Sequence, residues 1–363
     1  MNNIREIIEE EVVRRGVISF ARFMELALYC PNLGYYERPD VSPGRQGDFF
    51  TSVSVGKLFG ELLAFQFSGW IKAAPAGKWQ VLEAGAHEGR LAADILHWLE
   101  GHRPDLLKSL DYWILEPSAS RRQSQERTLG GLRGGVRWFD AWGALPPSGV
   151  HGVIFSSELL DAMPVHRLGW DAAGKKWFEW GVSLKDGDFA WTKMPENEGF
   201  KVARGRLELP PELIEVLPDG FTTEVCPAAS EWWRQAAGVL KGGKLVAIDY
   251  GLTVEELFMP QRREGTLRAY HRHHPGRNVL AHVGEQDITA HANFSAIREA
   301  GEAGGLRTEA LISQAQFLTG IAEKMWKEKG LMAEWNSTRA RQFQTLTHPE
   351  HLGQSFRVLI QAR

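Results

Sequence analysis

Apolar residues recur at helical spacing through much of the first 76 residues. The pattern predicts a helix over 4–15, ended by Gly16, and a second helix that begins after Ser19. A third, longer helix, started by a hydroxyl residue after a polar loop, is expected to run to Trp70. Residues 1–76 are therefore predicted to form an N-terminal helical extension.

Apolar runs that alternate with amphipathic stretches occupy the chain from residue 79 onward. The apolar runs predict strands over residues 79–84, 111–117, 135–140, 152–161, 244–251 and 356–360. Helical character is expected over 88–100, 294–301 and 321–343, and in the stretch that Ser118 caps. Repeated strand–helix units imply a parallel sheet covered by helices on both faces. The chain is therefore predicted to be an α/β protein with a Rossmann-like sheet.

Two inserts interrupt this alternation. They leave a cofactor-binding half at 77–165 and a second half of the α/β domain at 223–363. Residues 166–222 alternate between apolar and polar positions, with turn signals between the runs, which predicts a β-rich insert. Residues 252–290 are basic and rich in histidine, and they show little periodicity.

Composition narrows the class of protein. Hydrophobic residues make up 43% of the chain and charged residues 24%, as in ordinary globular proteins, and the net charge of -3 argues against general nucleic-acid binding. Cys30 and Cys226 are far apart and lack CxxC spacing, which favours a reducing compartment over a disulfide framework. No apolar stretch approaches the roughly 18 residues of a membrane span, and no targeting signal is recognisable, so a cytoplasmic location is expected.

The glycine-containing stretch after the first predicted strand is the main candidate for ligand binding. It reads as a strand, a tight turn at Gly85 and Gly89, and a helix whose N-terminus offers free backbone N–H groups. Many α/β proteins have such a turn for packing alone. A dinucleotide fingerprint fails, because His87 and Arg90 occupy two of its glycine positions, and no P-loop is present. NAD is therefore disfavoured, whereas Glu83-x-Gly85-x-x-x-Gly89 suits S-adenosylmethionine, which has no pyrophosphate.

Acidic residues recur at the ends of the predicted strands. They are Glu83, Glu116, Asp140, Glu158, Asp161 and Asp249. Because the carboxyl ends of parallel strands meet at one edge of a sheet, where ligands bind, these side chains are expected to lie together. Glu116 is the candidate acceptor for a ribose diol, and Asp140 for an adenine amino group. Gly47, Asp48 and Thr51 are candidates for the cofactor side, and a plain helix cap is the alternative for them.

Stretches along nearly the whole chain match one protein family in order. They are PNLGYY (31–36), GDFFTS (47–52), FGELL (59–63), the turn at 83–89, LEPS (115–118), SELLDAMPVH (157–166), IDYG (248–251), GTLRAY (265–270), DITAHANF (287–294) and HLGQSFRVL (351–359). On these residues the chain resembles the MidA family of S-adenosylmethionine-dependent methyltransferases, which includes a mitochondrial protein arginine methyltransferase needed for assembly of respiratory complex I. The resemblance implies a class I methyltransferase fold, S-adenosyl-L-methionine as cofactor, and arginine of a protein substrate as the methyl acceptor.

The chain departs from the family pattern at the expected pocket. Ala86 and His87 stand where the family turn has a proline and a glycine, and Val53 and Ser54 replace a proline and a glutamate. These departures motivate an alternative function, an assembly factor or scaffold that has lost catalysis, with or without bound cofactor.

The expected reaction requires the protein mainly to align the methyl donor with the acceptor. Methyl transfer from a sulfonium is an in-line displacement, which needs a well-positioned acceptor and no metal. Carboxylates would orient an acceptor guanidinium by paired hydrogen bonds, and Glu158 and Asp161 are the catalytic candidates. The histidines of residues 270–291 match no standard metal site, which favours a solvated or substrate-facing loop. A protein substrate is the expected partner, and a homodimer is left open.

Overall fold

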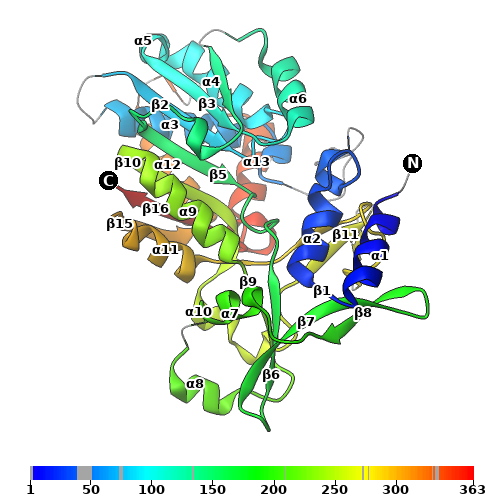
Figure 1. The fold of residues 1–363 in the computed structure, drawn as a ribbon. Helices are drawn as coiled ribbons and strands as arrows, with labels where there is room; N and C mark the ends of the chain where they lie inside the picture. Colours follow the sequence, from blue (N-terminus) through cyan, green and yellow to red (C-terminus); the bar gives the residue numbers. More distant parts are fainter. Residues whose placement is uncertain are drawn as a thin grey trace.

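One mixed sheet forms the centre of the molecule, and a smaller β-rich part lies beside it (Figure 1). The computed structural model describes residues 3–38, 51–72, 77–132, 135–207, 209–271, 274–276, 278–328, 330–331 and 335–363. Within these ranges, no helix has both the length and the apolar character that a membrane crossing demands.

The central sheet has eight strands, and their order creates a ligand-binding position. The strands are β2 (Trp79–Ala84), β3 (Leu110–Leu115), β4 (Val136–Phe139), β5 (Val150–Ser157), β10 (Leu240–Leu252), β14 (Ala292–Asn293), β15 (Arg307–Ser313) and β16 (Phe356–Ala362). The order is β15-β16-β10-β5-β2-β3-β4, with β14 paired to β10. The chain adds β3 and β4 on one side of β2, and then β5 and β10 on the other. β2 and β5 therefore flank the topological switch point, where open α/β sheets bind ligands.

One edge of this sheet differs from the predicted parallel arrangement. β16 runs antiparallel to both β10 and β15, whereas the pairs from β10 through β5, β2, β3 and β4 are parallel. The hydrophobic pattern does not predict β15, because this edge strand is only partly buried and its polar residues mask the alternation. Strand direction depends on how the chain crosses the sheet, which the pattern of a single strand does not encode.

Helices cover both faces of the sheet, as predicted. One face packs against α3 (Leu58–Lys72), α4 (Arg90–His102), α12 (Gln314–Lys327) and α13 (Ser337–Thr347). The opposite face packs against α9 (Pro227–Val239) and α11 (Phe294–Ala303). The short α5 (Pro104–Lys108) precedes β3, and α6 (Ala119–Leu129) follows it. The Ser118 hydroxyl caps α6 by accepting from the Arg121 N–H, as the sequence predicts.

Two predicted helices are divided in the structure. The helix expected to run to Trp70 is preceded by a separate 3-10 turn at Val53–Val55, and α3 begins only at Leu58. Gly56 separates the two with a φ of 138°, a conformation that L side chains rarely adopt. Residues 321–343 likewise contain the end of α12 and the start of α13 rather than one helix.

The N-terminal helices α1 (Ile4–Arg15) and α2 (Phe20–Tyr29) form as predicted, with Ser19 as the N-cap of α2. Their apolar residues share one core with Val182 and Phe189 of the β-rich insert and with Ile288. Packing therefore joins three parts of the chain that are far apart in sequence, and Figure 1 shows α1 and α2 against this β-rich region.

Two smaller sheets complete the fold. The first contains β1 (Ile18–Ser19), β6 (His166–Asp171), β7 (Lys176–Lys185), β8 (Asp188–Lys193) and β9 (Thr222–Val225). The same insert carries α7 (Glu198–Arg204) and α8 (Pro211–Val216), which its alternating pattern does not predict. Residues 252–290 hold α10 (Val254–Leu257) and a second sheet of β11 (Arg268–His271), β12 (His274–Gly276) and β13 (Asp287–Thr289).

Candidate active site

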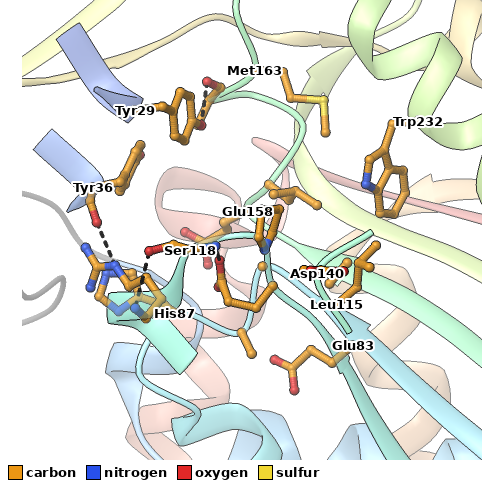
Figure 2. Close-up of a pocket in the computed structure, with 18 of the residues that line it drawn as sticks. Tyr29, Tyr36, Glu83, His87, Leu115, Ser118, Asp140, Glu158, Met163 and Trp232 are labelled. Carbon is orange, nitrogen blue, oxygen red and sulfur yellow. Dashed lines mark hydrogen bonds between the residues drawn. The ribbon is translucent and has the colours of Figure 1, made fainter. Parts of the chain in front are cut away.

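A cavity of about 1130 Å³ opens at the carboxyl ends of β2, β3 and β5, beside the switch point of the sheet. Its wall includes the turns that follow β2 and β5 and the segments that follow β3 and β4. Figure 2 shows side chains from these elements gathered around it, with Tyr29 and Tyr36 contributed by the N-terminal region. The volume exceeds the roughly 300–1,000 Å³ of most small-molecule sites, so a cofactor and part of an acceptor could occupy it together.

The turn after β2 approaches the cavity through a series of left-handed residues. Gly85, His87 and Gly89 have φ values of 74°, 48° and 81°, and Gly89 is the N-cap of α4. A Cβ on Gly85 would lie 2.9 Å from Cδ1 of Leu159, so conformation and space both favour glycine there. The turn thus presents its backbone and the start of α4 to the cavity, as the sequence predicts.

His87 fits the turn although it replaces a glycine of the family pattern. Its half-buried side chain lines the cavity, and Nε2 is buried without a hydrogen-bond partner among the described residues. Burial, reinforced by the guanidinium groups of Arg121 and Arg90, lowers the pKa of His87 to about 3. The imidazole is therefore neutral near pH 7 and adds no charge to the cavity wall.

Glu83 is a buried carboxyl group within β2, on the wall of the cavity. It accepts a hydrogen bond of 2.6 Å from the hydroxyl of Tyr112 on the neighbouring strand β3. Burial raises the pKa of Glu83 to about 7, and the Tyr112 hydrogen bond opposes that rise. Glu83 can therefore change its charge near neutral pH when a ligand arrives.

Gln125 holds the turn after β2 and the carboxylate after β3 in one arrangement. Its Nε2 donates to the carbonyl of His87 and to Oε2 of Glu116, both at 3.0 Å, while its Oε1 accepts from Nε1 of Trp138 at 3.0 Å. The side chain is fully buried. The other oxygen of Glu116 accepts from the Ser118 N–H at 3.0 Å. Gln125 is absent from the predicted site, since nothing in the pattern of a polar helix marks one glutamine as inward-facing.

Glu116 and Asp140 differ in their surroundings. Glu116 is 8% exposed, and burial raises its pKa. Asp140 is exposed on the cavity wall just after β4. Two indole rings line the cavity near it, Trp142 and Trp232, in an edge-to-face contact with centroids 5.2 Å apart. An acid beside aromatic rings suits the adenine end of a nucleoside, and the sequence does not single out these two tryptophans.

Glu158 is held on the cavity wall by a sharp turn after β5. Its φ is 55°, and its N–H donates to the carbonyl of Ile248 at 3.0 Å. The next two N–H groups, of Leu159 and Leu160, donate to Oδ2 of Asp249 at 3.0 and 2.8 Å. Asp249, near the carboxyl end of β10, therefore fixes the turn that carries Glu158.

The Glu158 carboxyl group is only half satisfied. Oε1 accepts from the Ser52 N–H at 2.9 Å, whereas Oε2 is buried and has no hydrogen-bond partner within the described residues. Burial, together with the charges of Asp249 and Asp287, raises the pKa of Glu158 to about 8, against the effect of the Ser52 hydrogen bond. A cationic ligand would satisfy this oxygen and favour the ionised form.

Asp161 occupies a different environment from its predicted partner Glu158. It is 6% exposed and is not among the residues that line the cavity. Burial, followed by the charges of Asp249 and Asp287, raises its pKa well above the usual value, and it shares a hydrogen bond with Asp249. The structure therefore places Asp161 behind the cavity wall, where it supports Asp249 instead of facing a ligand.

The predicted loop before α3 is only partly described. Thr51 is buried and lines the cavity, and its Oγ1 accepts from the Ser54 N–H at 2.9 Å. Gly47 and Asp48 lie outside the described residues. The contact between Ser52 and Glu158 nevertheless brings this loop to the part of the cavity wall that holds Glu158.

Two tyrosines add an aromatic wall that the acidic pattern does not reveal. Tyr29 and Tyr36 stack with ring centroids 5.5 Å apart at 27°. The Tyr29 hydroxyl donates to the carbonyl of Ala162 at 2.9 Å, and the Tyr36 hydroxyl donates to Oδ1 of Asp287 at 2.6 Å. Because both hydroxyls have partners, the rings contribute mainly their faces and edges to the cavity.

Comparison with known proteins identifies the family. A family model described as "Putative S-adenosyl-L-methionine-dependent methyltransferase" matches residues 62–312, well over half of the chain. The chain belongs to this family. The MidA resemblance is thereby confirmed, as are the class I methyltransferase fold and the S-adenosylmethionine cofactor.

Relatives of this methyltransferase cover nearly its full length. A Burkholderia thailandensis structure bound to S-adenosyl-homocysteine is 31% identical, with a TM-score of 0.81, over 99% of this chain and 92% of that one. A second structure from the same organism is 32% identical, with a TM-score of 0.82, over 99% and 91%. The Drosophila melanogaster protein arginine methyltransferase NDUFAF7 homolog, mitochondrial, is 26% identical over 97% of this chain and 83% of its own.

The expected cytoplasmic location is corrected by these relatives. The Drosophila protein and its Danio rerio counterpart, which is 26% identical over 98% of this chain, are both named mitochondrial. The expectation rested on the lack of a recognisable targeting segment, and such a lack does not indicate a compartment.

The cavity of this methyltransferase fits its cofactor. Gly85 lines the cavity and has no side chain, so its backbone is open to a ligand. His87, Glu116 and Asp140 line the same wall. These groups match an aminocarboxyl end, a ribose diol and an adenine amino group.

Proposed function

We propose that this methyltransferase transfers the methyl group of S-adenosylmethionine to the guanidinium of an arginine in a protein. The observation that carries the proposal is the half-satisfied carboxyl group of Glu158, which is buried on the cavity wall. Its relatives named protein arginine methyltransferases in Drosophila and Danio support the same acceptor.

The acceptor side of the cavity suits a planar cation. A guanidinium presents several N–H donors in a fixed plane, and one of them could satisfy Oε2 of Glu158. The ring faces of Tyr29 and Tyr36 supply cation–π attraction within the same cavity. An ionised Glu158 would hold the acceptor close to the methyl group. As the acceptor nitrogen bonds to the methyl carbon, the C–S bond breaks with its electron pair going to sulfur, and the carboxylate of Glu158 can take the proton that this nitrogen releases.

Residues at the ends of β2, β3 and β4 would bind the cofactor. Glu116, fixed by Gln125 and the Ser118 N–H, would accept hydrogen bonds from the ribose diol. Asp140 would accept from the adenine amino group, and Gly85, Gly89 and Thr51 would shape the remaining wall, with Gly47 and Asp48 retained as predictions. Glu83, on the cavity wall within β2, would also contact the cofactor. Bound S-adenosylmethionine supplies an electrophilic methyl group, so the protein's task is alignment.

Asp161 is proposed as a supporting residue instead of a catalytic one. Its hydrogen bond to Asp249 stabilises the turn that carries Glu158. His87 does not support the alternative of a scaffold without catalysis, because it adopts the left-handed backbone conformation that the turn requires. A homodimer stays a prediction that light scattering would test.

Labelled methyl transfer tests the proposal. The enzyme is incubated with methyl-labelled S-adenosylmethionine and a heat-treated protein extract, and the labelled amino acids are identified after hydrolysis. Methylarginine is expected. Glu158→Gln should lower its formation by about 100-fold, since misplacement of a reacting group costs that much. The exposed control Glu126→Gln, on α6, should match the wild type. Label found only in other residues, or full activity of Glu158→Gln, would contradict the proposal.

A further inference from the structure

We propose that His271, His282 and Glu285 form a binding site for a transition-metal ion, separate from the methyltransferase cavity. One ligand atom from each side chain lies within 4.8 Å of the others. None of the three lines the cavity. Two imidazole nitrogens and one carboxylate oxygen are a ligand set typical of Zn²⁺.

The fold brings together residues whose spacing in sequence matches no standard motif. His271 ends β11, while His282 and Glu285 lie in the segment that leads into β13. β11 and β13 pair antiparallel, with Tyr270 opposite Asp287. The pairing returns this segment to the end of β11, which is why the linear pattern of histidines does not predict the cluster.

The backbone that carries His282 and Glu285 is already fixed. The Gln286 side chain is 1% exposed and donates from Nε2 to the carbonyl of Val279 at 2.9 Å. Val279, Leu280 and Val283 are buried beneath the segment. The Glu285 N–H donates to the carbonyl of His282 at 2.8 Å. Binding therefore requires side-chain rotation and little ordering of the backbone.

One hydrogen bond sets the tautomer of His271 in the way that metal binding needs. Its Nδ1 lies 2.9 Å from the carbonyl oxygen of Glu285. A carbonyl can only accept, so Nδ1 carries the proton and Nε2 keeps its lone pair. A backbone carbonyl that accepts from the second ring nitrogen is the usual outer-shell partner of a metal-ligating histidine.

The rings of His271 and His282 stack on each other. Their centroids are 4.4 Å apart, with planes at 13°. Parallel rings do not aim their lone pairs at one point, so binding must rotate one of them. His282 and Glu285 are exposed, and His271 is half-buried, so solvent leaves room for that rotation.

Glu285 supplies the negative charge of the cluster. Its exposed carboxylate has an oxygen within 4.8 Å of a ring nitrogen of each histidine. A cation held between the three groups would be attracted by this charge. His282 also has a φ of 46°, in the left-handed region, and this conformation aims its side chain at His271.

The ligand set selects the class of ion. Ca²⁺ and Mg²⁺ prefer oxygen ligands, whereas Zn²⁺ and Co²⁺ accept imidazole nitrogen together with one carboxylate. Three protein ligands leave a fourth position for water. Since methyl transfer needs no metal, the ion would act structurally by joining β11 to the segment before β13. That segment reaches the N-terminal region, where Arg38 donates to the carbonyl of Gly284 at 3.1 Å.

Titration of untagged, chelator-treated protein with Co²⁺ and with Zn²⁺ tests the site. One ion per chain is expected, with the visible absorption of four-coordinate Co²⁺ and a rise in Tm on adding Zn²⁺. His282→Ala should weaken binding by at least about 100-fold, because even outer-shell changes cost 10–100-fold. Glu285→Gln should weaken it less.

His97→Ala is the matched control, since His97 is an exposed histidine on α4, away from the cluster. It should bind like the wild type. Circular dichroism would verify that each variant is folded. Failure of wild-type protein to bind below millimolar metal would overturn the proposal. The same holds if His282→Ala binds normally or if His97→Ala loses binding equally.

Discussion

Replacing Gln125 by leucine tests whether one buried side chain organises the cofactor wall. Leucine keeps a similar volume but removes the two hydrogen bonds donated to His87 and Glu116 and the one accepted from Trp138. Each group left unsatisfied in the interior costs about 1–3 kcal/mol. Water can reach the half-buried His87 and Trp138, so we expect the free energy of unfolding to fall by about 2–4 kcal/mol.

The effect on cofactor binding follows from Glu116. Gln125 donates to the oxygen that the Ser118 N–H does not reach, and a hydrogen bond to a charged group contributes about 1.5–3 kcal/mol. If that contact orients Glu116 toward the ribose, its loss should weaken S-adenosylhomocysteine binding about 10–100-fold, at about 1.4 kcal/mol per tenfold.

Calorimetry and urea unfolding separate these two effects. Gln123→Leu is the control, because Gln123 is an exposed glutamine on the same helix, and it should change neither quantity. If Gln125→Leu loses stability but binds S-adenosylhomocysteine like the wild type, the Gln125 hydrogen bonds stabilise the fold without organising the cofactor site. If neither stability nor affinity changes, the hydrogen-bond network itself is refuted.

A change of pH and two substitutions test other residues of the cavity wall and of the turn that carries Glu158. Burial raises the pKa of Glu83 to about 7 and of Glu158 to about 8, so the folded protein holds protons that the unfolded chain releases. The free energy of unfolding of the ligand-free protein should therefore fall as the pH rises from 4.5 to 8, and it should fall less in Glu83→Gln. An unfolding free energy that does not change with pH would refute this. Gly85→Ala should lower kcat/KM and destabilise the protein by about 1–2 kcal/mol in thermal unfolding, because its φ is 74° and the new Cβ meets Leu159. The control Gly101→Ala, on α4, should neither lower kcat/KM nor destabilise the protein. Asp249→Asn should lower kcat about 10–100-fold by loosening the Glu158 turn, with the Kd for S-adenosylhomocysteine nearly unchanged; an equal loss of affinity would assign Asp249 to cofactor binding.

Local features of this chain could be predicted because short-range physics determines them. The strand at 79–84 forms with the predicted bounds, since its apolar run is buried between two helical layers. Gly85 and Gly89 adopt the left-handed conformation that a tight strand-to-helix turn needs. Ser118 caps the helix after β3 as predicted, because its hydroxyl lies within reach of the free N–H groups in the first turn.

Features that depend on long-range placement could not be predicted. Glu158 and Asp161 are three residues apart, yet the left-handed turn at Glu158 sends one to the cavity and leaves the other beside Asp249. The inward orientation of Gln125 depends on which face of α6 meets the turn after β2. His271 and His282 meet only because β11 and β13 pair.

Titration of the wild-type chain with S-adenosylhomocysteine tests the central claim most directly, because every assigned role depends on a cofactor held at the ends of β2, β3 and β5. We expect one molecule bound per chain with a Kd below millimolar. Binding by Glu116→Ala should be at least about tenfold weaker, since a hydrogen bond to a charged group contributes about 1.5–3 kcal/mol. Absence of binding by the wild type at millimolar ligand, or equal binding by Glu116→Ala, would contradict it.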